Sequence, residues 1–174
     1  MRLVRNLAPL LLSIAWAGTA LAVSFNFTYV DDAGGTFASR GWLDSNSLFQ
    51  RNIRAAADLL GAHINSNQTI VVHVDTHSFS ARAGGTNSSG RFLYTNSAGK
   101  HVWEPGPLTR VLTGSNPGIV WGYDILLGFD ANFLQNSYWF DPQPELRSAA
   151  VPADKGDFIS VVMHEFGHGL DKGE

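Results

Sequence analysis

The segment DFISVVMHEFGHGL, Asp157 to Leu170, constrains the fold more than any other part of the chain. Its apolar residues recur every three or four positions, which predicts a helix with one buried face: Phe158, Ile159, Val162 and Phe166. Asp157 is suited to cap the first turn. Gly167 and Gly169 lie inside this helix, where each costs about 1 kcal/mol relative to alanine. Because such local rules are broken most often at functional sites, we expect this core helix to carry a site as well.

Four further segments have a regular pattern. Residues 24–30 alternate aromatic and polar side chains, which predicts a half-buried strand. A helix is predicted to begin at Asp44 or Ser45, since apolar residues spaced by threes and fours follow on one face. Residues 68–76 carry β-branched side chains on both faces, which is typical of a central strand, and residues 122–131 predict another strand.

Two long segments lack such patterns. Residues 77–118 are rich in Gly, Ser, Asn and Pro, and we interpret them as surface loops with one short hairpin. Residues 136–156 are irregular, and their aromatic cluster Tyr138, Trp139 and Phe140 is interpreted as a core plug under a loop rather than the wall of a binding site. The order of the elements predicts an α+β or α/β fold, in which one sheet carries two main helices.

The chain begins with the pattern of a secretory signal. Arg2 and Arg5 precede an apolar run over residues 7–17 and a small-x-small sequence that ends at Ala22. We expect cleavage after Ala22, with residues 23–174 forming one exported domain, secreted or periplasmic. The alternative, a membrane anchor, is disfavoured because the run is shorter than the roughly 20 residues that span a bilayer.

Charge and cysteine content exclude several classes of protein. Removal of the two leader arginines lowers the basic count from 12 to 10 against 15 acidic residues, which gives a formal charge of −5. This argues against nucleic-acid and anionic-membrane partners, which require clustered Lys and Arg. The chain has no cysteine, so a metal would be held by nitrogen and oxygen atoms alone.

Two histidines one helical turn apart carry the predicted chemistry. His164 and His168 are four residues apart, so their rings project from one face of the helix and can converge on one zinc ion. Glu165 lies about 100° around the helix and is placed to accept a proton from a zinc-bound water. This is the amide-hydrolysing arrangement of the H-E-x-x-H motif. The alternative is a pair of surface histidines on an amphipathic helix.

These residues resemble the active-site helix of metzincin-type zinc metallopeptidases, particularly exported bacterial ones. The likeness is strong over residues 157–170, while residues 122–131 are moderately similar to the family's D-I-x-I-x-F strand, which lies beside the substrate cleft. The resemblance implies that His164 and His168 bind Zn²⁺ and that Glu165 is the catalytic base. It also implies an α+β fold with a twisted, mixed sheet and two main helices, the second carrying the motif.

The chain departs from the family pattern H-E-x-x-H-x-x-G-x-x-[HD] after the second histidine. Asp171 occupies the glycine position, so Gly173 is expected to end the helix instead, and Glu174 occupies the position of the third metal ligand. The methionine turn that family members have beneath the metal is not evident. We therefore expect a divergent or truncated domain that lacks part of its carboxyl-terminal portion.

The sequence thus predicts a secreted zinc-dependent metalloendopeptidase that hydrolyses protein or peptide substrates. The alternatives are a non-catalytic, exported zincin-like domain and a zincin of another clan, whose third ligand is a distant glutamate. A second, structural metal at His73 and His77, which flank Asp75, is less favoured than ordinary surface histidines.

Overall fold

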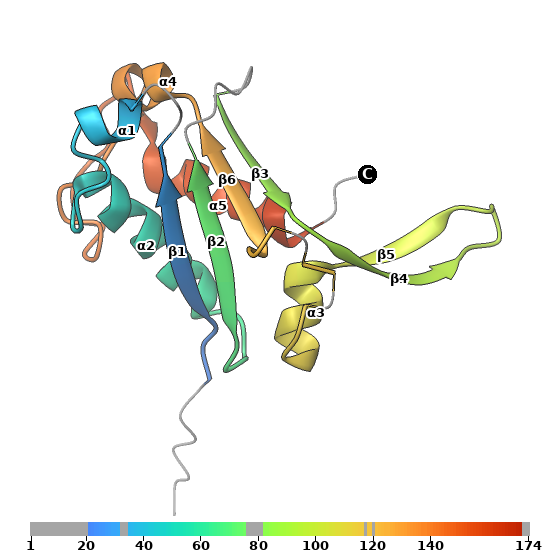
Figure 1. Ribbon diagram of the computed structural model, residues 1–174. Helices are drawn as coiled ribbons and strands as arrows, with labels where there is room; N and C mark the ends of the chain where they lie inside the picture. Colours follow the sequence, from blue (N-terminus) through green and yellow to red (C-terminus); the bar gives the residue numbers. More distant parts are fainter. Residues whose placement is uncertain (1–20, 32–34, 76–81, 117, 120, 172–174) are drawn as a thin grey trace, which may run out of the picture.

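A four-stranded mixed sheet forms the centre of the fold. The computed structural model describes residues 21–31, 35–75, 82–116, 118–119 and 121–171, so the predicted signal lies almost entirely outside the described residues. The strand order is β1-β2-β6-β3, with β1, β2 and β6 parallel and β3 antiparallel to β6 (Figure 1). The strands are β1 (Ser24–Val30), β2 (Thr69–Asp75), β3 (Ala83–Asn87) and β6 (Ile125–Phe129).

The two main helices lie on one face of this sheet (Figure 1). Helix α2 (Leu48–Gly61) packs against β1 and against α5 (Phe158–Leu170), which carries the two histidines. The inward side chains of β2 and β6 alternate with outward ones and are fully buried, and large aromatic residues fill the space beneath them. The shared core includes Val72, Leu127, Phe49, Phe158 and Phe166. The fold is therefore α+β, with a mixed sheet.

Shorter elements surround this core. A two-stranded hairpin projects away from the body, and α3 lies at its base (Figure 1). The remaining elements are α1 (Thr36–Ser39), β4 (Gly90–Thr95), β5 (His101–Pro105), α3 (Gly106–Thr113), α4 (Ala131–Asn136), β7 (Tyr138–Trp139) and β8 (Gly156–Asp157). Among the described residues, none of the helices combines the length and apolar character needed to cross a bilayer.

Several predicted boundaries and one loop assignment are wrong. Helix α2 begins after Ser47, whose hydroxyl accepts a hydrogen bond from the Gln50 backbone, and not at Asp44 or Ser45. The segment assigned to loops, residues 77–118, contains the hairpin but also strand β3 and helix α3. In contrast, β1, the inner position of β2, and the Asp157 cap of α5 are confirmed.

Candidate metal and active site

Helix α5 is held firmly at both its amino end and its buried face. The Asp157 carboxylate accepts a hydrogen bond from the Ser160 backbone and forms a 2.8 Å ion pair with Arg147. Burial raises the pKa of Asp157, but the hydrogen bonds from Arg147 and Ser160 outweigh it, so the pKa lies below its usual value. Phe158 and Phe166, both fully buried, fix the rotation of the helix about its axis. The exposed face of α5 is therefore well defined.

His164 and His168 converge on this exposed face. Their Nε2 atoms lie 3.1 Å apart, and their rings are perpendicular with centroids 4.6 Å apart. Two nitrogen ligands of a tetrahedral zinc ion, each about 2.0–2.1 Å from it, are separated by about 3.3 Å. The two nitrogens are thus close enough to share a metal ion, although 3.1 Å is also the length of a hydrogen bond between the two rings. That they bind one zinc ion stays a prediction.

Glu165 lies beside the pair but faces inward. Only 7% of the residue is exposed, and it lines a cavity of about 840 Å³ together with His164. Tyr138 and Arg82 line the same cavity. The guanidinium of Arg82 lies 4.8 Å from the centre of the Phe133 ring, an arrangement that attracts a cation to the ring face. One cavity thus brings together an imidazole, a carboxylate and a phenol.

Tyr138 is the member of this group that the sequence did not identify as a site residue. Its ring and that of Phe140 pack against the core, as the plug interpretation predicts. Burial raises the pKa of the Tyr138 phenol; the charge of Arg82 lowers it and that of Glu165 raises it, and the net shift is upward. No described residue hydrogen-bonds the Tyr138 hydroxyl, which is therefore an available donor.

The edge strand β3 crosses directly over the middle of α5. A Cβ atom on Gly85 would lie 1.8 Å from the Glu165 carbonyl oxygen, so only glycine permits this approach. The strand predicted to lie beside the cleft, β6, is an inner strand, and β3 occupies the edge. A second cavity, of about 480 Å³, is lined by residues 85–90 of this edge, by His168 and by Asp171.

The two glycines of α5 have different roles. A Cβ atom on Gly169 would lie 2.6 Å from Cγ2 of Ile125, so this glycine allows the helix to approach β6 closely. A Cβ atom on Gly167 would meet nothing within 4 Å among the described residues. Packing thus explains the unfavourable glycine at position 169 but not the one at position 167.

No third candidate metal ligand accompanies the histidine pair in the described part of the chain. Glu174, the predicted ligand, and Gly173 are outside it, and the described residues contain no group of three His, Asp or Glu side chains that could hold a metal. Helix α5 already ends at Leu170, where Asp171 adopts an extended conformation and its backbone N–H donates to the Gly167 carbonyl at 3.0 Å. The prediction that Gly173 ends the helix is therefore wrong.

The suggested second metal site has little support. His73 stacks on the ring of Tyr123, with centroids 5.0 Å apart, and His77 lies outside the described residues.

Comparison of the chain with protein-family models, with curated proteins and with solved structures found no match.

Proposed function

We propose that the chain is a zinc-dependent endopeptidase domain. The observation that carries this proposal is the 3.1 Å separation of the His164 and His168 Nε2 atoms, with Glu165 on the same helix between them. An H-E-x-x-H helix of this kind is suited to binding zinc beside a carboxylate base. The proposed export of the protein is compatible with a hydrolase that acts on external proteins.

The roles of the side chains follow from their positions. His164 and His168 would bind zinc through Nε2, and zinc supplies the Lewis acidity that activates water and polarises a peptide carbonyl. Glu165 would accept a proton at its carboxylate from the attacking water and later donate it to the leaving amine. Its low exposure, 7%, at the wall of this cavity favours this role, because a carboxylate shielded from solvent exchanges protons more selectively with a bound substrate.

Tyr138 adds a second polar group to the proposed mechanism. Like any tyrosine, it is protonated at neutral pH, and burial raises its pKa further; its hydroxyl has no competing partner among the described residues. A neutral donor in the same cavity as Glu165 can stabilise negative charge that develops on the substrate carbonyl oxygen. We assign Tyr138 this role in substrate and transition-state binding.

The competing proposal is an exported, non-catalytic zincin-like domain. The observation that favours it is that the described residues supply two converging metal ligands and not three. Such a domain would bind zinc weakly or not at all, and it would not cleave peptide bonds.

Metal analysis and proteolysis together test the proposal. Purified protein is stripped with chelator, reloaded with zinc and analysed by elemental analysis; we expect about one zinc per chain in wild type. His164→Ala should lose the metal, and His63→Ala, which removes an exposed histidine at the end of α2, should keep it. Glu165→Ala should retain zinc but lose casein hydrolysis. Equal zinc content in wild type and His164→Ala would eliminate the metal site, and equal proteolysis by Glu165→Ala would eliminate the proposed base.

A further inference from the structure

The projecting hairpin β4–β5 bears an aromatic surface. Phe92 pairs with Trp103 across the two strands, and a register shift between Phe92 and Tyr94 places Tyr94 opposite Val102 on the other face. Phe92 makes edge-to-face contacts with Trp103 and His101 at centroid distances of 5.5 and 5.4 Å. We call these three residues the aromatic ladder. The fold leaves 46% of Phe92 and 43% of Trp103 exposed.

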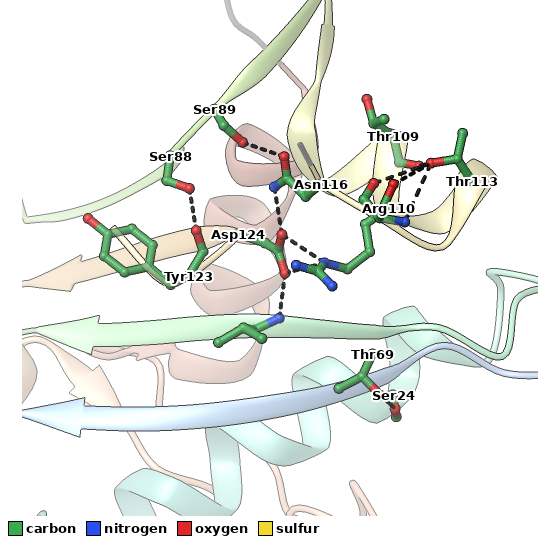
Figure 2. A network of polar contacts seen from close by, with 12 residues as sticks. Ser24, Thr69, Ser88, Ser89, Thr109, Arg110, Thr113, Asn116, Tyr123 and Asp124 are labelled. Carbon is green, nitrogen blue, oxygen red and sulfur yellow. Dashed lines mark hydrogen bonds and ion pairs between the residues drawn. The ribbon is translucent and has the colours of Figure 1, made fainter. Parts of the chain in front are cut away.

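The base of the hairpin is fixed by a buried polar network (Figure 2). Asp124, which is fully buried, forms a 2.8 Å ion pair with Arg110 of α3 and accepts hydrogen bonds from Asn116 and from the Val71 backbone. Asn116 in turn accepts a hydrogen bond from Ser89, immediately before β4. A buried charge with this many partners holds its neighbours in one arrangement, so the hairpin is attached rigidly to the sheet.

The hairpin also continues the edge of the candidate site. Strand β3 ends at Asn87, whose side chain donates to the Asp171 carbonyl at the end of α5, and β4 begins at Gly90. The cavity lined by residues 85–90 and His168 therefore leads from the histidine pair to the base of the hairpin. Small side chains along this path, including Ser88 and Gly90, leave room for the backbone of another chain.

We propose that the aromatic ladder binds an apolar side chain of an extended polypeptide substrate whose backbone lies along this cavity. The inference rests on the proposed peptidase function and adds a substrate class to it: extended or unfolded proteins rather than short peptides. Gly85 and Phe92 are seven residues apart, a span of at most about 23 Å in an extended chain. The bound apolar residue should therefore lie about six to eight residues from the one at the metal.

Peptides anchored at the metal test this spacing. The probes are fluorescein-labelled serine/glycine peptides that carry a zinc-binding hydroxamate at one end, prepared in both chain directions. A single phenylalanine is placed two, four, six, eight or ten residues from the hydroxamate. With zinc-loaded wild type, fluorescence anisotropy should give a Kd about tenfold lower for spacings of six to eight than for spacings of two. Phe92→Ser/Trp103→Ser should abolish that gain and leave the two-residue probe unchanged.

Leu146→Ser is the matched control, because Leu146 is an exposed apolar residue in the loop between β7 and β8. A Kd that does not depend on spacing, or an equal loss in Leu146→Ser, would overturn the inference and leave the proposed function intact. Sedimentation that shows a wild-type dimer and a monomeric double variant would also overturn it, since a second copy would then cover the ladder. Failure of every hydroxamate peptide to bind wild type more tightly than His164→Ala would instead refute the metal site, and the inference with it.

Discussion

Alanine should destabilise the protein strongly at Gly85, where β3 crosses α5, weakly at Gly169, and should stabilise it at Gly167. In Gly85→Ala, the new Cβ would lie 1.8 Å from the Glu165 carbonyl oxygen and 2.6 Å from its carbonyl carbon. Ordinary contacts are at least about 3.2 Å, so the two backbones must separate by about 1.4 Å. The Gly85 backbone is hydrogen-bonded to β6, and the Glu165 backbone is hydrogen-bonded within α5. Neither can therefore move without weakening these hydrogen bonds.

The expected magnitude follows from those losses. Overpacking costs about 1–3 kcal/mol, and weakening of two ladder hydrogen bonds adds about 1 kcal/mol each, so Gly85→Ala should lower the free energy of unfolding by about 3–5 kcal/mol. In Gly169→Ala the new Cβ would lie 2.6 Å from Cγ2 of the buried Ile125, and this variant should cost about 1–2 kcal/mol after its gain in helix propensity. The Cβ in Gly167→Ala would meet no described atom within 4 Å, and this variant should raise stability by about 1 kcal/mol.

Urea denaturation followed by circular dichroism measures all three free energies, and thermal melts should follow the same order. For a chain of this size, Tm should shift by about 2–4 °C for each kcal/mol. Because the clash in Gly85→Ala is with the Glu165 backbone, this variant should also lose proteolysis beyond its loss of folded protein. Gly85→Ala as stable as wild type, or less stable by no more than Gly169→Ala, would refute the proposed contact between β3 and α5.

Three more predictions concern single groups. Asp157→Asn should lower stability by about 1 kcal/mol at pH 7, because asparagine can still cap the helix but loses the ion pair with Arg147. Because the pKa of Asp157 is depressed, its carboxylate stabilises the fold above pH about 4, and urea titrations at pH 7 and pH 2.5 should show the difference disappearing in acid. Tyr29→Phe should raise stability by about 1 kcal/mol, because its buried hydroxyl has no hydrogen-bond partner among the described residues. Burial, partly offset by Arg54, raises the pKa of Tyr29 to about 12. Between pH 10 and 12 the unfolded tyrosine therefore loses its proton and the folded one keeps it, so wild type should lose stability relative to this variant by about 1.4 kcal/mol per pH unit. Parallel plots of unfolding free energy against pH for the two proteins would contradict this. Tyr138→Phe should retain zinc and lower kcat about 100-fold on a chromogenic peptide; an unchanged kcat would remove the hydroxyl from the mechanism.

The core strands and the motif helix were predictable because their patterns reflect burial. The alternation of Phe25, Phe27 and Tyr29 in β1 and the spacing of apolar residues in α5 both follow from which side chains face the core. The positions of His164, Glu165 and His168 relative to one another depend on helix geometry alone. These features are local, so the sequence contains them directly.

The elements that were missed depend on contacts between distant segments. Strand β3 has the sequence AGGTN, with glycines that disfavour a strand, and Gly85 is needed only because α5 passes beneath it. Helix α3 was not predicted because it lies in a Gly- and Pro-rich stretch. Its first turn contains Pro107, and a proline at this position is a known signal of a helix start. Tyr138 shares a cavity with Glu165 only because the irregular segment after β6 folds back beside α5.

The turn at the far end of the β4–β5 hairpin is held by hydrogen bonds between its own residues. The Asn96 side chain accepts hydrogen bonds from the Ala98 and Lys100 backbones, and Gly99 has a positive φ of 77° with open space around it. These hydrogen bonds join residues of the turn to one another, whereas the opposite end of the hairpin is held by Asp124. The tip is therefore the natural place to graft an epitope or a fluorophore, and a label there would report on chains that pass along the arm while leaving the histidine pair undisturbed.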